Sequence, residues 1–302
     1  MVIRTFGLER GTVLALLVGA LPITLLPAYA LAAGGALARR RGLTVVGLAL
    51  VVAHLVVIAP ALGAATMPVG TDAAPRLRVV VANLYVLNPT PEAAGRTLRA
   101  LRPDVLVVPE LDARGLAALT AAGLLADLPF SVVREGARLE TVGLFSRTPL
   151  ADTTTREVGG RALPRSTVQV GGVAVRLLAV HPLPPISVFE PLWRSALDDL
   201  RGEAAGLTLP AVVAGDFNAD RDHAPFRRLL GTGGLRDAHD ERGRGLARTY
   251  PASAPVLQLD HVLVRDGRTA RLVVRSVREV RIPGSDHLAV VADVAVLAEQ
   301  RG

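Results

Sequence analysis

Carboxylate, carboxamide and imidazole side chains stand at the ends of six apolar runs in this chain, where strands of a sheet would begin or end. The residues are Asn83, Glu110, His181, Asp216, Asn218, Asp260, Asp286 and His287. One such residue is usually a turn cap, but independent caps would use Ser, Thr and Gly as often. Oxygen ligands without cysteine suit Mg²⁺ or Mn²⁺. A hard divalent cation beside histidines suits hydrolysis of a phosphate ester, in which charge is neutralised and a water is activated.

The segment AVVAGDFNAD, residues 211–220, places a carboxylate and a carboxamide two positions apart. Side chains alternate between the two faces of a strand, so Asp216 and Asn218 are expected to share a face while Phe217 packs into the interior. A buried strand would present the pair at the carboxyl end of a sheet, which is where α/β proteins place their chemistry.

Composition excludes several other chemistries. The chain has no lysine, so a phosphate-binding loop of the G-x-x-x-x-G-K-[ST] type cannot form, and the G-x-S-x-G motif of serine hydrolases is absent. It has no cysteine, which excludes disulfides and thiolate metal sites. The net charge of +7 is unevenly placed, because residues 1–75 carry five arginines against two acids, and it favours an anionic partner only weakly.

Two long apolar runs precede the part of the chain that holds the polar residues. Residues 12–33 carry no charge, and residues 43–66 contain only His54 as an ionisable group. At about 1.5 Å per residue, each run is long enough as a helix to cross a bilayer. We therefore expect residues 1–66 to form a transmembrane helical hairpin, with two buried core helices as the alternative.

Proline should shape both helices. Pro22 and Pro27 are expected to kink the first helix, and Pro60 to bend the second near its end. We assign no role to His54 and expect a neighbouring helix to hold it.

The triple arginine at 39–41 predicts the orientation of the hairpin. Such a loop stays in the cytoplasm, which makes the chain a multi-pass cell-membrane protein with everything after the second helix extracytoplasmic. Arg4 and Arg10 argue for the opposite orientation. An alternative takes residues 1–30 as a signal peptide that is cleaved after AYA. That reading would leave one helix with the triple arginine outside, against the charge rule.

The rest of the chain has an α/β pattern. Residues 67–76 predict a linker, because Pro and Gly punctuate them, and residues 77–302 predict one domain. Mixed strands with few helices indicate two packed sheets flanked by helices. The expected helices cover residues 90–103, 113–126 and 189–206.

The ordered motifs resemble those of a known family. VANL, RPDVLVVPEL, GLFSRTPL, AVHPLPP, GDFNAD, LDHVLV and SDHLAVVADV are similar, in this order, to the motifs of the endonuclease/exonuclease/phosphatase superfamily, which has the DNase I-like fold. The resemblance runs through residues 77–298, and GDFNAD is nearly diagnostic. It implies a four-layer α/β/β/α sandwich, here preceded by the hairpin, and a phosphoric ester hydrolase that depends on Mg²⁺ or Mn²⁺.

The resemblance also implies a role for each matching residue. Glu110 would bind the divalent metal, with help from Asn83 and Asp286. Asp216 would orient and deprotonate the attacking water, and Asn218 would hold that water or a phosphate oxygen.

The remaining residues would stabilise charge. Asp260 would pair with His287, and a carboxylate beside an imidazole raises its pKa and keeps it cationic toward phosphate. His287 and His181 would stabilise the pentacovalent phosphate. His261 alternates to the opposite face and is expected to be structural.

The chain departs from the family pattern in places that bear on the substrate. Some nuclease members carry a second acid where this chain has Tyr85, the usual glutamine before the metal-binding glutamate is Pro109, and the phosphate-contacting tyrosine of many members has no clear counterpart. Arg147, Arg165 and Arg194 could grip phosphate oxygens, or could be solvated surface residues.

Three functions remain open at this stage. We expect a membrane-anchored phosphoesterase that acts on lipid-linked phosphate or pyrophosphate of the cell envelope, as in a membrane-anchored bacterial subgroup that the chain resembles. An extracytoplasmic nuclease is the alternative, although aromatic residues for stacking make up only 3% of the chain. A membrane module without activity is the third. The expected partners are a phosphate-ester substrate and the bilayer, with no obligate protein partner.

Overall fold

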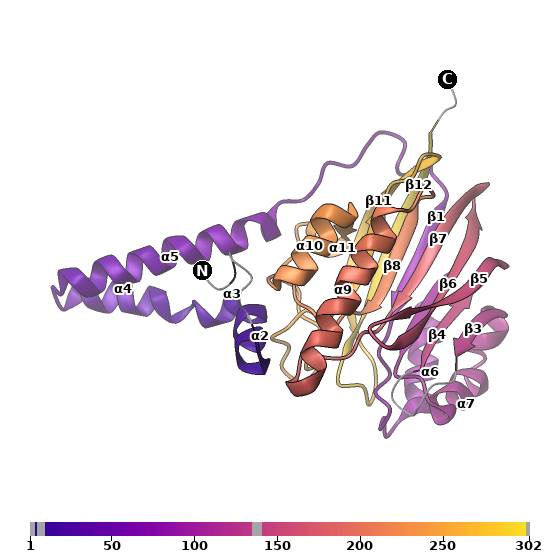
Figure 1. Ribbon diagram of the computed structural model, residues 1–302, viewed down its shortest axis with the longest axis horizontal. Coiled ribbons are helices and arrows are strands. Elements are labelled where there is room, and N and C mark those ends of the chain that lie inside the picture. The colour runs from indigo at the N-terminus through magenta and orange to yellow at the C-terminus, as the bar shows by residue number, and fades with distance from the viewer. Residues whose placement is uncertain (1–3, 5–9, 135–140, 300–302) are drawn as a thin grey trace.

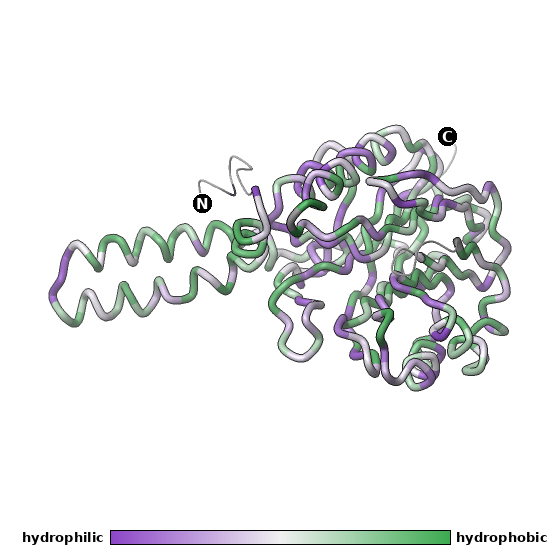
Figure 2. Tube along the Cα trace, turned by 60° about the horizontal axis from the view of Figure 1, so that its bottom comes forward, coloured by the Kyte–Doolittle hydropathy of each residue, from purple (hydrophilic) through white to green (hydrophobic). Residues whose placement is uncertain are grey.

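The computed structural model describes residue 4, residues 10–134 and residues 141–299. A helical hairpin projects from a sandwich of two sheets (Figure 1). The helices of the N-terminal part are α2 (Thr12–Gly19), α3 (Leu21–Thr24), α4 (Pro27–Leu37) and α5 (Arg41–Leu62). Helices α4 and α5 lie side by side and are hydrophobic along most of their length, with a hydrophilic tip (Figure 2).

The first apolar run is not one helix. Helix α2 and the segment from Leu21 to Leu37 meet at an angle of 74°. The break follows from Pro22 and Pro27, which stand in the first turns of α3 and α4 and cannot donate a backbone hydrogen bond to the preceding turn. The prediction of a single kinked helix over 12–33 is therefore corrected to three helices that end at Leu37.

Helix α5 agrees more closely with the prediction of a helix over 43–66. It begins at Arg41 and ends at Leu62. The helix ends there because Gly63 is extended and Ala64 pairs with Arg242 of the sandwich. Among the described residues, α5 is the one helix that is by itself long and apolar enough to cross a membrane, while α2 to α4 meet that length only as a bent pair.

The strands form two six-stranded mixed sheets. The first sheet contains β1 (Arg76–Val81), β2 (Val105–Pro109), β3 (Phe130–Arg134), β4 (Val142–Ser146), β11 (Ala270–Arg281) and β12 (Leu288–Ala298), in the order β11-β12-β1-β2-β4-β3. The second contains β5 (Leu150–Val158), β6 (Arg161–Val170), β7 (Val173–Val180), β8 (Ala211–Asp216), β9 (Arg236–Asp237) and β10 (Asp260–Arg265), in the order β5-β6-β7-β8-β10-β9.

Helices cover the outer face of each sheet and complete the four layers, so the predicted sandwich is confirmed. The first sheet is covered by α6 (Pro91–Ala100), α7 (Ala113–Ala121) and α8 (Leu124–Asp127). The second is covered by α9 (Glu190–Ala205) and α10 (Ala224–Gly233), with a short 3₁₀ helix η1 (Ser187–Phe189) before α9 and α11 (Ala238–Glu241) after β9.

Alternation within the strands explains the two cores. Val79 and Val81 of β1 belong to the cluster between the sheets, while Val80 and Ala82 belong to the cluster under α6 to α8. Both faces of a central strand are covered, which is why its sequence reads as an uninterrupted apolar run.

The parallel pairs place the candidate residues. Strands β1 and β2 pair in parallel, as do β7 and β8, and the other neighbours are antiparallel. The carboxyl ends of both pairs meet at one rim of the sandwich. The contact between Asn83, which follows β1, and Asp216, at the end of β8, shows this. The division of the chain at residues 66 and 76 stays a prediction, although β1 does begin at Arg76, and the outer limits at residues 1 and 302 lie outside the described residues.

Candidate active site

Asp216 is the last residue of β8 and is almost fully buried. The preceding Gly215 lies at φ 154°, and a Cβ there would stand 1.9 Å from the carbonyl oxygen of Val180. Glycine therefore permits the close approach of β8 to β7 that brings Asp216 to the rim.

Asn218 reaches the same site by a turn and not by strand alternation. The strand ends at Asp216, and Asn218 has a left-handed backbone with φ 49°. Its N–H donates to Asp216 Oδ1 over 2.8 Å, and its side chain donates to the carbonyl of Pro182 over 3.0 Å. The expectation that a continuous strand aligns the two residues is therefore wrong, although both line one cavity. Phe217 is buried, as expected.

Asn83 connects two carboxylates across the sheets. Its Nδ2 donates to Glu110 over 3.0 Å and to Asp216 over 3.1 Å, while its Oδ1 accepts from the N–H of Tyr85. These partners fix the orientation of the amide, since the reverse orientation would face oxygen against oxygen. Glu110 also accepts from the N–H of Val86. Asn83 therefore positions both acids, and as a metal ligand it would use the second lone pair of its oxygen.

Asp260 and His287 form a buried pair. Asp260 begins β10, and its Oδ2 lies 2.8 Å from His287 Nδ1. Burial opposes protonation of the imidazole, but the charges of Asp260 and Asp216 outweigh it and raise the pKa of His287 to about 10. His287 Nε2 lies 3.8 Å from Asp216 Oδ2, so a cationic ring faces that carboxylate. Burial in turn raises the pKa of Asp216 to about 7, while the charge of His287 opposes the shift.

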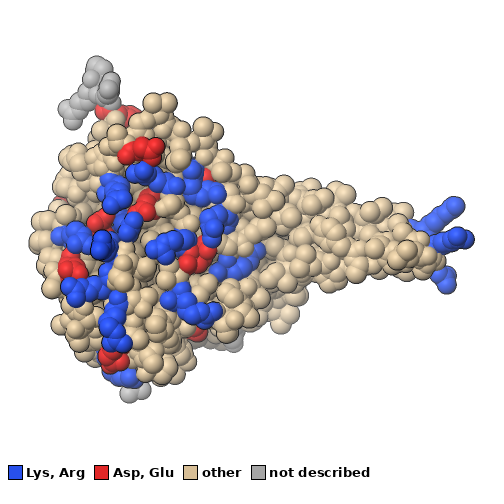
Figure 3. Space-filling view, turned by 180° about the vertical axis from the view of Figure 1, so that it is seen from behind, with Lys and Arg blue, Asp and Glu red and all other residues tan. Residues whose placement is uncertain are grey.

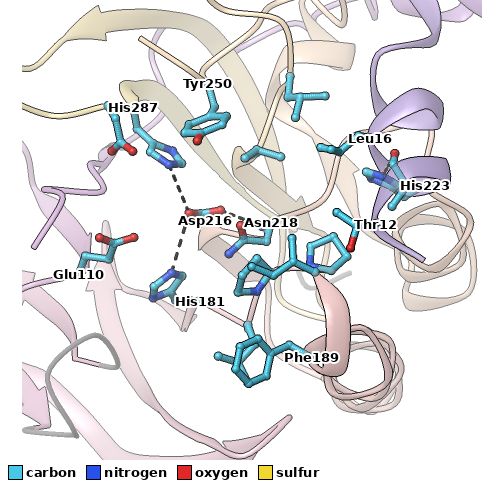
Figure 4. Close-up of a pocket in the computed structure, with 18 of the residues that line it drawn as sticks. Thr12, Leu16, Glu110, His181, Phe189, Asp216, Asn218, His223, Tyr250 and His287 are labelled. Atoms are coloured by element: carbon cyan, nitrogen blue, oxygen red, sulfur yellow. Dashed lines mark hydrogen bonds and ion pairs between the residues drawn. The ribbon is translucent and has the colours of Figure 1, made fainter. Parts of the chain in front are cut away.

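His181 faces Asp216 from the other side, with its Nε2 3.9 Å from Asp216 Oδ2 (Figure 4). Its Nδ1 lies 2.8 Å from a guanidinium nitrogen of Arg161. Arginine can only donate, so Nδ1 accepts and the proton of the neutral ring is on Nε2. Burial and the charge of Arg161 lower the pKa of His181. His181 is thus a neutral donor, in contrast to the cationic His287.

Asp286 has a carboxylate oxygen to which no group donates a hydrogen bond among the described residues. That oxygen, Oδ1, is buried. Burial raises the pKa of Asp286, the charge of His287 opposes this shift, and the nearby charge of Glu110 adds to it. A divalent cation would satisfy both acids, so the residues present fit the metal that the family resemblance implies.

A second set of ligand atoms lies deeper. Asp216, Asp260 and His287 each offer an atom within 4.8 Å of the others. The bond between Asp260 and His287 already uses one atom of each, and a protonated imidazole cannot ligate a metal. Glu110 and Asp286 are therefore the better-suited pair.

The site opens into a cavity of about 780 Å³. Six of the eight residues singled out from the sequence line it, namely Glu110, His181, Asp216, Asn218, Asp286 and His287. Asn83 and Asp260 lie behind them and hold them in place through the bonds described above.

Arg161 and Tyr250, which stand beside the two catalytic-site histidines in the cavity wall, were not predicted from the sequence. Arg161 at the start of β6 orients His181, and Tyr250 lies with its ring centroid 4.8 Å from that of His287. Arg161 is one of 34 arginines, and Tyr250 stands in a loop without periodicity. Only the tertiary structure brings them to the site.

The three arginines proposed as phosphate contacts lie elsewhere. Arg147 pairs with Asp104, Arg165 is buried and makes a bidentate pair with Glu203, and Arg194 pairs with a glutamate four residues earlier. None of them is among the residues that line the cavity in the described structure. Of the two alternatives that the sequence left open for these arginines, phosphate contact in this cavity is not supported, because an acid elsewhere holds each side chain.

Two histidines to which the sequence assigned no catalytic role, His54 and His261, lie outside the cavity. His261 is fully buried and hydrogen-bonds Asp237, on the side of β10 away from the cavity. His54 Nδ1 lies 3.1 Å from the hydroxyl of Tyr29, so the neighbouring helix holds it as expected.

Comparisons with known proteins agree with this geometry. The model of the Endonuclease/Exonuclease/phosphatase family matches residues 80–287. Similar solved structures include a humanized D. rerio TDP2 (15% identity, TM-score 0.60, 72% of this chain and 98% of that chain) and an endonuclease/exonuclease/phosphatase from Beutenbergia cavernae (22%, 0.58, 74% and 72%). Sphingomyelinase C from Streptomyces griseocarneus is also similar (18%, 0.53, 72% and 99%). No curated protein matches the chain. At these identities the solved structures show the fold alone.

Proposed function

The chain belongs to the endonuclease/exonuclease/phosphatase family, and from this premise we propose that it is a membrane-anchored, metal-dependent phosphoesterase that acts on envelope lipids carrying phosphate or pyrophosphate. One observation carries the proposal. Asp216 lies on the cavity wall between a cationic and a neutral imidazole, and Asp286 of the same wall has a buried carboxylate oxygen without a hydrogen-bond partner among the described residues.

The residues divide the chemistry of hydrolysis. Asp216 takes the proton of the attacking water, since burial places its pKa near the range of a general base at neutral pH. Asn218 holds that water or a phosphate oxygen. His287 faces the developing negative charge as a cation, and His181 donates a hydrogen bond to it. A Mg²⁺ or Mn²⁺ ion at Glu110 and Asp286, with Asn83 beside them, would neutralise charge on the phosphate oxygens.

The hairpin supports a lipid substrate over a nucleic acid. A tether beside the bilayer raises the effective concentration of a headgroup substrate, whereas a nuclease gains nothing from it. Single-stranded nucleic acid needs aromatic platforms and clustered cations, and this chain has few aromatic residues. Arginine side chains cover one face of the sandwich without forming a single basic groove, because acids are interspersed among them (Figure 3).

The hairpin tip supports an extracytoplasmic site. Arg39, Arg40 and Arg41 are exposed at the end of the hairpin that points away from the sandwich (Figure 3). If that end is cytoplasmic, the sandwich lies on the opposite side of the membrane.

A substrate panel tests the proposal. The purified full chain is assayed in detergent with an isoprenyl pyrophosphate, a phospholipid, DNA and bis(4-nitrophenyl) phosphate, with Asp216→Ala as the blank. We expect a lipid substrate to be hydrolysed fastest. Faster cleavage of DNA would replace the lipid proposal by the nuclease, and no turnover above the blank on any substrate would refute the phosphoesterase.

A further inference from the structure

We propose that helix α2 forms one wall of a channel that holds the hydrocarbon chain of a lipid phosphoester while its phosphate lies at Asp216. The inference rests on the proposed function and adds to it a site for the lipid chain. Helix α2 lies outside residues 80–287, which the family model matches, so the family motifs do not account for this wall.

Helix α2 is docked on the sandwich by specific contacts. His223 Nδ1 accepts from the N–H of Asp220 over 2.8 Å, so its Nε2 carries the proton and donates to the carbonyl of Ala15 over 2.9 Å. At the start of α2, the N–H of Gly11 donates to Glu190 over 2.9 Å. A buried imidazole that donates to the backbone of α2 fixes the helix against the loop before α10.

The last residue of α2 fits closely against the same loop. A Cβ at Gly19 would lie 3.0 Å from Leu257 and 3.1 Å from the ring of His223. The absence of a side chain thus lets the backbone of α2 approach the cavity wall.

The cavity has a polar end and an apolar end. Asp216, His181 and His287 stand at the polar end (Figure 4). The other end lies between α2 and the segment before α9, and its apolar lining residues are Ala15, Leu16, Leu183, Ile186, Phe189 and Leu257. Thr12 and His223 stand beside Leu16 at this end (Figure 4). A phosphate that bears a long hydrocarbon chain has this same division, and about 780 Å³ lies within the range of small-molecule sites.

The apolar end of the cavity continues into exposed apolar side chains at the base of the hairpin. Leu16, Ile186 and Phe189 line the cavity and are also 49%, 44% and 39% exposed, and Val188 beside them is 75% exposed. Contiguous exposed apolar surface marks a membrane or protein contact. The 74° bend places α2 across the end of the hairpin next to the sandwich (Figure 1), so a hydrocarbon chain could pass from a bilayer to Asp216 along apolar surface.

Two matched variants test the channel by turnover. Leu16 and Leu17 are adjacent on α2 and equally exposed at 49%, but only Leu16 lines the cavity. The full chain in nanodiscs is assayed with methyl and dodecyl 4-nitrophenyl phosphate, and the ratio of the two kcat/KM values is compared. We expect Leu16→Trp to lower the dodecyl-to-methyl ratio by about tenfold or more, because it excludes methylenes from the channel, while Leu17→Trp leaves it within about twofold of wild type. Equal ratios in the two variants would refute the channel.

A binding measurement separates the channel from catalysis. Dodecyl phosphate with a diazirine at the end of its chain is photo-crosslinked to the wild type and to Asp216→Ala, and the labelled peptides are identified by mass spectrometry. We expect label in residues 12–19 and 183–189 of both proteins. Label confined to α4 and α5 would refute the channel even if the esters are hydrolysed. Label in the expected peptides without turnover of any ester would support the channel and refute the phosphoesterase.

Discussion

At the residue scale, Asp216 is the proposed general base. Asparagine at this position would keep a hydrogen-bond acceptor for Asn83 or Asn218 but could not take a proton from water. We expect Asp216→Asn to lower kcat by about 10²- to 10⁴-fold, as measured with the substrate that the panel identifies. Asp198→Asn is the matched control, because Asp198 is partly exposed on α9 and distant from the cavity. Near-normal turnover in Asp216→Asn would contradict the assigned role.

We expect Asp260 to act through His287 and not on the substrate. It holds the ring and its positive charge by the 2.8 Å bond to Nδ1. We therefore expect Asp260→Asn and His287→Gln to lower kcat/KM without additivity, so that the double variant is about as slow as the slower single one. A double variant whose loss equals the product of the two single losses would show that the pair does not work as a unit.

Glu110 should determine how much divalent metal the protein needs for activity. EDTA is expected to abolish turnover, and Mg²⁺ or Mn²⁺ to restore it. Glu110→Gln should raise the metal concentration that gives half-maximal activity by about 10-fold or more, since a charged oxygen ligand is lost. Glu92→Gln on the exposed side of α6 serves as the control. Activity that EDTA leaves unchanged would remove the metal from the mechanism.

Most of the candidate site residues could be predicted from the sequence by their residue types. The carboxylates and histidines at strand ends are unusual enough to be named from sequence, and six of the eight reach one cavity. Arg161 and Tyr250 could not be named, because an arginine on β6 and a tyrosine in a loop become site residues only through contacts with His181 and His287.

At the scale of elements, the strands were more predictable than the turns between them. Apolar runs located β1, β2, β7 and β8, whose burial on both faces leaves a clear signal. The turn that brings Asn218 back to Asp216 depends on a left-handed backbone and one hydrogen bond, which alternation cannot indicate. The breaks after α2 and α3 involve Pro22 and Pro27, but the sequence does not indicate the 74° angle between α2 and the following helices.

Helix α11 is held to strand β11 by a buried ion pair. His239 Nε2 lies 2.9 Å from Glu279 Oε1. Burial opposes the charged ring, but hydrogen bonds and charges from Asp237 and Glu279 raise the pKa of His239 to about 9. Burial also opposes the charge of Glu279, yet the bond from His239 lowers its pKa to about 2. The stabilisation from His239 is complete below pH 6.5 and is lost as pH rises through about 9.

This pair predicts a pH-dependent stability. The shift of His239 corresponds to about 3 kcal/mol in the free energy of unfolding, so Tm of the full chain in detergent should fall by several degrees from pH 6.5 to 9.5. Glu279→Gln should lower Tm at pH 6.5 and reduce the further loss at high pH. Glu157→Gln, on the exposed part of β5, should keep the wild-type profile. Identical pH profiles for Glu279→Gln and wild type would contradict the role of the pair.

At the scale of the whole molecule, the hairpin and the sandwich meet at the catalytic rim. The chain after α5 pairs with the sandwich through Ala64 and Arg242, and α2 packs beside the cavity. The hairpin is therefore joined to the domain at both ends, and its α2 end lies in the cavity wall. A substrate taken from a bilayer would be drawn from the leaflet in which the base of the hairpin lies.

The orientation of the hairpin therefore selects the leaflet. The exposed arginines at 39–41 predict a cytoplasmic tip, and hence a sandwich on the outside. Trypsin added to cells whose cytoplasmic membrane is intact and accessible should remove a tag placed after residue 302, because Arg76 and many other arginines of the sandwich are exposed. In inverted vesicles the tag should be protected. Replacing the three arginines by serine should produce a mixed population, since Arg4 and Arg10 would then dominate the charge balance. Protection in cells and cleavage in inverted vesicles would instead place the sandwich in the cytoplasm, where only lipids of the inner leaflet could reach Asp216.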